Sequence, residues 1–555
     1  MFSFLSVFTD FFPYASDPHA YWTGYFTSRP TIKRFERVGN HFLQVCKQLS
    51  ATAKVQESHF EPHLTMLRKA MGVMQHHDAV TGTEKQHVAS DYARLLNQAI
   101  SACSANTKSA LNQFVTGKAP PPPKAQKDGH SKAATTPDYW DFKFTTCLNL
   151  NISVCDVSEN SDQFVVTAYN PLAHATYQYV RVPVGGSKYE VKDYRNIVVP
   201  SQLVKIPSSL MSLDYRLSKA DYELVFQATE VPALGFKSYF VSRVLNEIRP
   251  EVVQIMSRQK RKPDPVSIGN EFLNITFDVN GLLSEITVDG VKSKLSQNFV
   301  YYKGATGNNE VYENRSSGAY IFRPDPKTKE NLISKEAKLE VFKGDQVDEV
   351  HQVFNEWISQ VVRVYKTEKF VEFEWLVGPI PVDDNFGKEV ISRFYTVMKT
   401  KGVFYTDSNG REMLKRQRNH RDTWKVDLKE QVAGNYYPIN TKIAIEDEVH
   451  RLAILTDRAQ GGSSIFDGTV ELMVKVFKVL SVIWFTKLSF FFFLFFLRCI
   501  DVCCMTMPLA LEVCAWSNFT RRPTSWNSFL SSSFLLLLSP FNSQRHLTRR
   551  LTARV

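Results

Sequence analysis

The sequence lacks the spacings with which a protein closes a zinc site from its own side chains. It contains no CxxC pair and no HExxH motif. Its apolar opening, MFSFLSVF, also has neither the basic n-region nor the small-residue cleavage site of a clean signal peptide. We therefore expect no signal peptide in this chain, and we expect the true start of a secretory form to lie upstream.

The body of the chain has little net charge. The whole sequence carries +11, but residues 475–555 contain ten Lys and Arg against two acids. This tail accounts for +8, which leaves +3 for residues 1–474. Nucleic-acid-binding domains concentrate basic residues over their binding surface, so we predict no nucleic-acid partner.

Extended disorder is excluded by composition. Of 555 residues, 43% are apolar and 13% are aromatic, which is enough to build several packed cores. A chain of this length is expected to form two to four domains.

Cysteine is scarce, and half of it lies in the tail. The four cysteines of the body are Cys46, Cys103, Cys147 and Cys155. The body of the chain contains three N-glycosylation sequons, which begin at Asn151, Asn274 and Asn314. An even number of body cysteines, two of them flanking a sequon, favours an oxidising secretory route. The alternative is that the sequons arose by chance.

Residues 1–115 are predicted to form a three-helix bundle. The segment KRFERVGNHFLQVCKQL places its apolar residues on one stripe at helical spacing. A second helix is predicted from about Phe60 to His77. A third starts near Thr83, where Thr83–Gln86 fits a capping box.

The period then changes from helical to strand-like. Residues 116–138 are rich in Pro and Lys and are predicted to form an exposed linker or insertion. Alternating segments such as FVVTAYN and YELVFQA predict a small β domain over 139–256. A basic, Pro-containing loop is expected at 257–267. Its two interpretations are a dibasic processing site and a solvated loop.

Residues 268–474 alternate repeatedly and are predicted to form an antiparallel β-sandwich. Within this range, TDSNG (406–410) carries the Asn-Gly signal of a hairpin turn. The predicted fold class is therefore α+β and multidomain, with a helical bundle followed by antiparallel β-sandwich domains.

The tail, residues 475–555, differs from the rest in composition. Residues 479–497 are apolar and long enough to span a bilayer, but Lys487 lies near their centre. The stretch consists mostly of Phe, Leu and Ser, which pyrimidine-rich codons encode. We interpret the tail as translated non-coding sequence; a membrane anchor and a buried helix are the alternatives. A membrane partner is not expected.

The segment MQHHDAVTGT joins two histidines and an acid to a turn. An imidazole and a carboxylate at a helix end are suitable for a divalent metal or a sugar hydroxyl. Adjacent helical residues point about 100° apart, so at most one of His76 and His77 is expected to face a given site. Asp78 begins the turn, and Gly82 permits an unusual backbone angle. The alternative is a polar helix terminus that favours histidine by its dipole.

The string QHHDAVTGTEKQHVASDYARLL resembles the signature of the glycoside hydrolase family 38 α-mannosidases. The upstream string DFFPYASDPHAYWTGYFTSRP is similar to the family's preceding segment. SSGAYIFRP, FYTDSNGREML, VAGNYYPIN and ILTDRAQGGSSIFDGTVELMV follow in the order of the lysosomal branch. The resemblance covers roughly residues 8–474.

The resemblance implies roles for four residues. His77 corresponds to a zinc ligand and Asp78 to a side chain that contacts the sugar. Trp22 lines the sugar subsite, and Tyr320 reaches it from the β domain. The family's disulfide pattern implies the pairs Cys46–Cys103 and Cys147–Cys155. Ser16 and Asp17 depart from the family, which often has an Asp at the position of Ser16.

The family's reaction is a retaining hydrolysis of α-mannosides by two carboxylic acids with zinc. Those acids and the remaining zinc ligands lie in an N-terminal α/β domain that precedes the matching segment. We therefore expect this chain to be an inactive portion of a lysosomal enzyme that removes mannose from N-linked glycans. The alternative is a non-catalytic product that binds glycans or a partner protein. Linkage preference and a homo-oligomeric state stay open.

Overall fold

A computed structural model describes residues 10–53, 57–117, 144–244, 264–422, 424–475, 503–510 and 535–540. The chain forms two compact units that interleave along the sequence. Unit 1 combines Met1–Arg34, His77–Ala89 and Val253–Ser528. Unit 2 combines Phe35–His76, Ser90–Val252 and Phe529–Val555.

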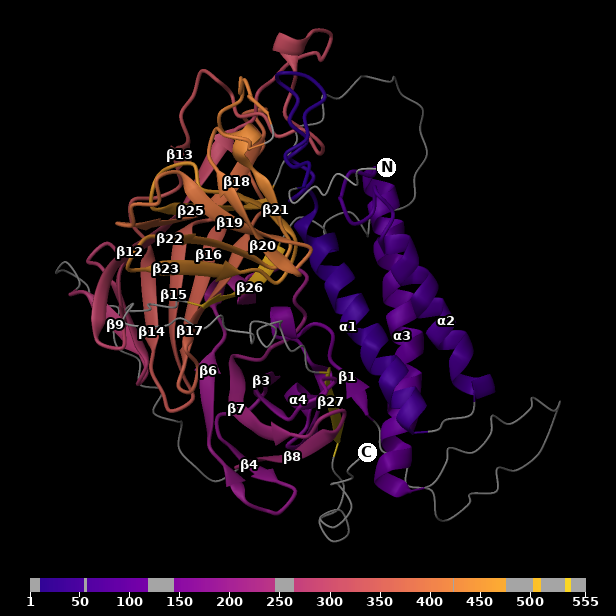
Figure 1. Ribbon diagram of the computed structural model, residues 1–555. Coiled ribbons are helices and arrows are strands. Elements are labelled where there is room, and N and C mark those ends of the chain that lie inside the picture. Colours follow the sequence, from indigo (N-terminus) through magenta and orange to yellow (C-terminus); the bar gives the residue numbers. More distant parts are fainter. Residues whose placement is uncertain are drawn as a thin grey trace, which may run out of the picture. The chain divides into compact units, whose positions relative to one another are not determined.

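Unit 2 contains most of the predicted helical bundle (Figure 1). The three long helices are α1 (Pro30–Thr52), α2 (Glu57–Met74) and α3 (Gln86–Thr116). Buried apolar residues line their facing sides, among them Leu49, Leu67 and Leu96. Gly39 on α1 lets the helices approach closely, because a Cβ there would lie 2.7 Å from Met71 Sδ and 2.8 Å from Leu96 Cδ1.

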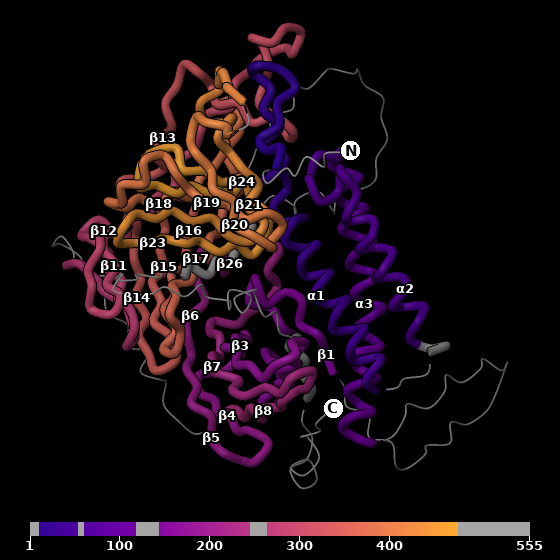
Figure 2. The backbone as a smooth tube through the Cα atoms, in the orientation of Figure 1, coloured from indigo at the N-terminus to yellow at the C-terminus, as the bar shows by residue number. Residues whose placement is uncertain are grey.

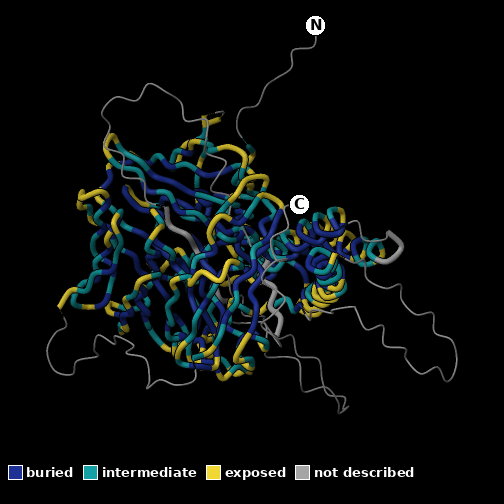
Figure 3. The backbone as a smooth tube through the Cα atoms, turned by 90° about the horizontal axis from the view of Figure 1, so that it is seen from below, coloured by how far each residue is buried: buried dark blue, intermediate teal, exposed yellow. Residues whose placement is uncertain are grey.

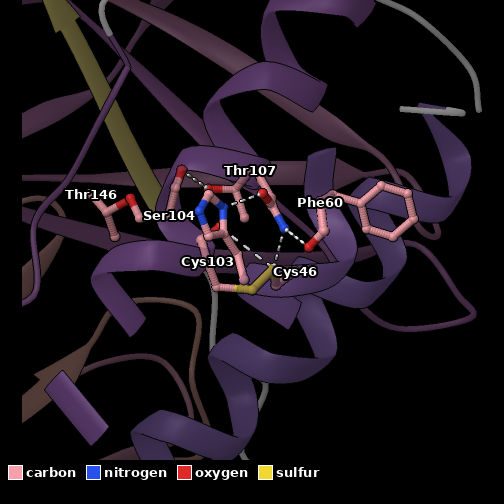
Figure 4. The surroundings of a disulfide bond; sticks show 8 residues. Cys46, Phe60, Cys103, Ser104, Thr107 and Thr146 are labelled. Atoms are coloured by element: carbon pink, nitrogen blue, oxygen red, sulfur yellow. Dashed lines mark hydrogen bonds between the residues drawn. A yellow bond between two sulfur atoms is a disulfide. The ribbon is translucent and has the colours of Figure 1, made fainter. Parts of the chain in front are cut away.

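A disulfide between Cys46 and Cys103 links α1 to α3, as the resemblance implied (Figure 4). Beside it, Asn106 Nδ2 donates to the Phe60 carbonyl at 2.9 Å, which connects α3 to α2. The second implied disulfide, Cys147–Cys155, is also present. Both pairs are therefore confirmed.

Two expectations about helix ends were wrong. Helix α2 ends at Met74, three residues before the predicted end at His77. Helix α3 begins at Gln86, three residues after the predicted start near Thr83. Thr83 Oγ1 donates to Asp78 Oδ1 at 2.8 Å, so this hydroxyl links the turn to its own acid.

The small β domain of unit 2 has two sheets in the described residues. One sheet has the order β1-β27-β2-β8-β4-β5 and the other β3-β7-β6, and every pairing is antiparallel. The strands are β1 (Thr145–Thr146), β2 (Gln163–Tyr169), β3 (Thr176–Val184), β4 (Tyr189–Asp193), β5 (Val198–Val199), β6 (Ser201–Lys205), β7 (Tyr222–Val231), β8 (Phe236–Arg243) and β27 (Leu535–Pro540). Short helices accompany them: η1 (Leu150–Ile152), α4 (Asp156–Asn160) and α5 (Ser208–Met211).

Unit 1 contains three further sheets, and Figure 2 shows the course of their backbone. The largest comprises β9 (Val266–Gly269), β10 (Leu273–Phe277), β11 (Leu283–Val288), β12 (Val291–Lys303), β13 (Asn331–Leu332), β18 (Lys388–Thr396), β21 (Tyr437–Ile439), β24 (Gln460–Ser463) and β25 (Thr469–Lys475). A second comprises β14 (Lys338–Phe342), β15 (Val347–Asn355), β16 (Ile358–Tyr365), β17 (Phe370–Val377) and β26 (Cys503–Ala510). A third comprises β19 (Val403–Ser408), β20 (Glu412–Gln417), β22 (Lys442–Glu446) and β23 (Arg451–Leu455). Two 3-10 turns are η2 (Tyr312–Asn314) and η3 (Ala433–Asn435).

These sheets share one apolar core, so the predicted sandwich is confirmed. Phe299 on β12 packs edge-on against Phe354 on β15, and Phe373 on β17 packs against Phe394 on β18. Each pair joins the first sheet to the second, and the four rings belong to one buried cluster. Figure 3 shows long runs of buried backbone, and β16 is buried at every position because both of its faces are covered.

The predicted Asn-Gly hairpin is also confirmed. Ser408 on β19 pairs with Glu412 on β20, and Asn409 and Gly410 between them have φ of 49° and 70°. Two left-handed residues match the twist of the flanking strands, which is why this dipeptide gives tight hairpins.

Parts of the unusual tail form strands. β26 and β27 pair with body strands, whereas residues 479–497 lie outside the described residues. Among the described helices, none is long and apolar enough to cross a membrane.

Candidate functional site

The part of the histidine-rich motif that begins at His77 forms a turn in unit 1. The Gly82 amide donates to the Ala79 carbonyl at 3.0 Å, and the Thr83 amide donates to the Asp78 carbonyl at 3.2 Å. Gly82 has a φ of +75°, as expected from its place in the motif. The Thr81 hydroxyl donates to the His77 carbonyl and also contacts the Thr83 hydroxyl. The turn therefore fixes the backbone on which His77 and Asp78 are placed.

Lys33, near the start of α1, stabilises this turn by hydrogen bonds to its backbone. Its side chain is buried, and Nζ donates to the carbonyls of Ser28 (2.9 Å), Val80 (2.8 Å) and Thr81 (2.7 Å). Burial lowers the pKa of Lys33 to about 7, and the neighbouring Glu84 opposes that decrease. At acidic pH the ammonium form provides the three N–H groups that these acceptors need.

Trp22 is placed by a short hairpin of residues 14–22. Its amide donates to the Tyr14 carbonyl at 2.9 Å, and Ala15 forms an antiparallel bridge with Tyr21. The indole Nε1 donates to Ser16 Oγ at 3.0 Å. Ser16, one of the two departures from the family pattern, therefore fixes the orientation of the Trp22 ring.

Asp17, the other departure, forms an ion pair with Arg315. Its side chain is 4% exposed and accepts from Arg315 Nε at 2.8 Å and from the His19 amide at 2.9 Å. Asp17 thus ties the hairpin to the loop that follows β12 instead of offering a carboxylate at the surface.

Tyr320 brings that loop to the turn. The Gly24 amide donates to the Tyr320 carbonyl at 3.1 Å, and Ser28 Oγ donates to the Ala319 carbonyl at 2.6 Å. The Tyr320 hydroxyl donates to Asp78 Oδ1 at 2.9 Å, and its ring lies 5.5 Å from the Trp22 ring. Three residues far apart in the sequence, Trp22, Asp78 and Tyr320, therefore meet at one place.

The donor set at this place suits a divalent metal. Within the described residues, the group able to hold an ion with three ligand atoms is His76, His77 and Asp78, whose atoms lie within 4.8 Å of one another. The His77 side chain is 85% exposed, and its Nε2 lies 3.8 Å from Asp78 Oδ2. Because α2 ends before both histidines, the expectation that at most one faces a site does not hold. Imidazole nitrogen and carboxylate oxygen are ordinary zinc ligands.

A buried acid supports the loop that carries Tyr320. Glu389 on β18 is 1% exposed, and Ser317 Oγ donates to its Oε1 at 2.9 Å. Ser317 Oγ in turn accepts from the Arg323 amide at 3.1 Å. Burial raises the pKa of Glu389 to about 8, so the carboxyl is protonated under acidic conditions.

Replacing Glu389 with glutamine is expected to flatten the pH dependence of stability. The folded pKa of about 8 exceeds the ordinary 4.5, so the stabilisation is full below pH 4.5 and is lost as the pH rises through 8. Between about pH 5 and pH 7 the free energy of unfolding of the wild-type protein should fall by about 2 kcal/mol. The Glu389→Gln variant should not show this decrease. Urea unfolding across this pH range measures the free energy of unfolding of both proteins. The same pH dependence in wild type and Glu389→Gln would contradict the prediction.

The structure adds residues that the sequence did not single out. Lys33 and Glu389 lie in ordinary amphipathic and strand patterns, and their roles come from contacts with distant segments. The hydrophobic character of their neighbours was visible, but no local signal distinguishes these two charges from solvated ones. The three sequon residues, Asn151, Asn274 and Asn314, are all exposed.

Three domain families match the sequence. "Glycosyl hydrolases family 38 C-terminal domain" matches residues 268–476, and "Alpha mannosidase middle domain" matches residues 20–114. "Lysosomal alpha-mannosidase-like, central domain" matches residues 199–241.

Curated relatives match over the same region. Lysosomal alpha-mannosidase from Bos taurus is 45% identical over 472 residues, covering 84% of this chain and 42% of the relative. Lysosomal alpha-mannosidase from Homo sapiens is 44% identical over 473 residues, covering 84% and 43%. Alpha-mannosidase from Canavalia ensiformis is 38% identical over 482 residues, covering 84% and 47%. The chain thus spans less than half the length of these relatives.

A solved structure shares the fold. An alpha-mannosidase from Enterococcus faecalis V583 aligns over 89% of this chain and 56% of its own chain, with a TM-score of 0.54 and 13% identity. At this identity the likeness concerns the arrangement of elements alone.

Proposed function

Because this chain belongs to glycoside hydrolase family 38, we propose that it forms the mannose-binding portion of a zinc-dependent α-mannosidase. The observation that carries the proposal is the convergence of Trp22, Asp78 and Tyr320 beside His77 within one compact unit. These four are the residues to which the family resemblance assigns contacts with metal and sugar.

Each side chain has a physical role in binding. The Trp22 and Tyr320 rings offer apolar faces to the C–H groups of a pyranose, and the Ser16 contact keeps the Trp22 ring in place. The Asp78 carboxylate accepts hydrogen bonds from sugar hydroxyls. Tyr320 and Thr83 both donate to its Oδ1, which fixes the rotamer before a sugar arrives.

His77 would hold the metal through its imidazole, with Asp78 adjacent. A bound zinc ion would hold mannose hydroxyls and polarise them. The remaining ligands are proposed to come from an N-terminal α/β domain, because a structural or catalytic zinc needs at least three protein ligands.

Hydrolysis with retention requires two carboxylic acids on either side of the glycosidic bond. The resemblance assigns both acids to that N-terminal domain. We therefore propose that the chain as printed binds sugar without turning it over. In the complete protein it would remove terminal mannose from N-linked glycans in the lysosome, with the exposed sequons at Asn151, Asn274 and Asn314 glycosylated along the secretory route.

The test uses the product of the complete coding transcript and the variant Asp78→Asn. Asparagine keeps an oxygen for Tyr320 and Thr83 but loses the charge, so the fold should persist. The loss of one charge-assisted hydrogen bond is expected to lower kcat/KM for a chromogenic α-mannoside about 10- to 100-fold.

The matched control is Asp427→Asn, which removes a carboxylate that is 80% exposed and pairs with Lys429. It should leave kcat/KM unchanged. Equal activity of Asp78→Asn and wild type would reject the assigned role. Turnover by the printed 555-residue chain would reject the assignment of both acids to a preceding domain.

A further inference from the structure

One exposed aromatic beside the site has no role in the proposed binding of the terminal mannose. Tyr14 is 52% exposed, and its ring lies 5.5 Å from the Trp22 ring at an interplanar angle of 72°. Trp22 makes a second edge contact with Tyr320, at 5.5 Å and 62°. Tyr320 in turn contacts Asp78. Three aromatic rings thus form a connected row that begins at the Asp78 carboxylate.

The backbone that carries Tyr14 is fixed. Its carbonyl accepts from the Trp22 amide, and the Ser16 amide donates to the Ala20 carbonyl at 3.1 Å. Asp17, in the same turn, is anchored to Arg315. A ring on such a backbone loses little conformational entropy when a ligand packs against it, which is why rigid aromatics dominate binding surfaces.

Tyr14 does not serve to fill the protein core. The nearby Phe12 directs its ring against Phe26 at 5.6 Å and packs on the large core cluster. Tyr14 instead keeps about half of its surface in solvent while touching Trp22. Single exposed aromatics are common, but binding sites combine adjoining aromatic side chains with a few placed polar groups, as these three rings and the Asp78 carboxylate do.

We propose that Tyr14 forms a second sugar subsite, which stacks on the residue next to the terminal mannose of a glycan. The inference rests on the proposed function, because the terminal mannose must occupy the place bounded by Asp78, Tyr320 and Trp22. The neighbouring sugar then lies over Trp22 and Tyr14, where ring faces rather than charges hold it. The subsite therefore selects oligosaccharides over monosaccharides and adds no catalytic group.

The test is saturation-transfer NMR on the full chain with methyl α-mannoside and with α-mannobiose, a mannosyl-mannose disaccharide. In the wild type, both rings of the disaccharide should receive saturation, and it should bind about three- to tenfold more tightly than methyl α-mannoside. Tyr14→Ala should remove this advantage and lower the saturation of the reducing ring by about half or more, while the terminal ring is unaffected. Tyr14→Phe should behave as wild type, because the ring and not the hydroxyl makes the contact.

The control is Tyr177→Ala, which removes a tyrosine of similar exposure (47%) on β3. Tyr177→Ala should leave the affinity and the saturation of both sugars unchanged. An equal advantage of the disaccharide in wild type and Tyr14→Ala, or no advantage in wild type, would overturn the subsite while leaving the binding of the terminal mannose intact. Absence of saturation from either sugar would overturn the proposed sugar site and the subsite with it.

Discussion

Replacing Lys33 with methionine is expected to lower the free energy of unfolding by about 3–5 kcal/mol. Methionine has a similar length and fills the space, but it leaves the carbonyls of Ser28, Val80 and Thr81 without their donor. It also removes a positive charge beside the buried Glu84, whose two carboxylate oxygens accept no hydrogen bond within the described residues. Urea unfolding at acidic pH, where Lys33 is an ammonium, measures the loss.

Two variants separate these causes. Lys47→Met changes an exposed lysine of the same helix and should alter stability by less than about 0.5 kcal/mol. The double variant Lys33→Met, Glu84→Gln should recover part of the loss, since it also removes a buried carboxylate whose remaining cationic neighbour is Arg29. If Lys33→Met were as stable as Lys47→Met, the three hydrogen bonds would contribute nothing. The affinity for zinc should also fall in Lys33→Met, because the turn that carries His77 loses its hydrogen bonds to Lys33.

Replacing Gly82 with alanine is expected to cost about 3–4 kcal/mol and to displace the turn of residues 77–83. The left-handed φ of +75° alone costs an L-residue about 1–2 kcal/mol. In addition, the new Cβ would lie 2.2 Å from the Ser28 carbonyl oxygen and 2.7 Å from its carbon. These are backbone atoms held by Lys33, so they cannot move aside cheaply. The midpoint temperature of thermal unfolding and the affinity for methyl α-mannoside should both decrease.

The chain provides two matched glycine controls. Gly117, after α3, has a φ of +69° with open space around it, so Gly117→Ala should show the cost of the backbone angle alone, about 1 kcal/mol. Gly72, within α2, has neither constraint, and Gly72→Ala should stabilise the protein by about 0.5–1 kcal/mol. A Gly82→Ala variant no less stable than Gly117→Ala would show that the close approach to Ser28 is not required.

Local patterns in the sequence predicted most of the fold. The apolar stripe containing Phe42 and Cys46 lies inside α1, and the alternation of FLNITFDV gives β10. Asn409 and Gly410 form the hairpin turn because the dipeptide adopts left-handed angles readily. The predicted ends of α2 and α3 lay three residues inside the connection between them, because residues 78–83 form a turn held by their own backbone hydrogen bonds.

The sequence by itself determined most of the helices and strands, the turn at Gly82 and, through motifs of a known family, which residues are proposed for the site. Only the tertiary structure decided how they are supported. Lys33 meets the turn at Val80 and Thr81, Glu389 meets Ser317, and Tyr14 extends the row of Trp22 and Tyr320. The physical reason is that periodicity and turn chemistry act between near neighbours in the chain. Burial, pKa shifts and ring contacts depend on segments that folding brings together from far apart.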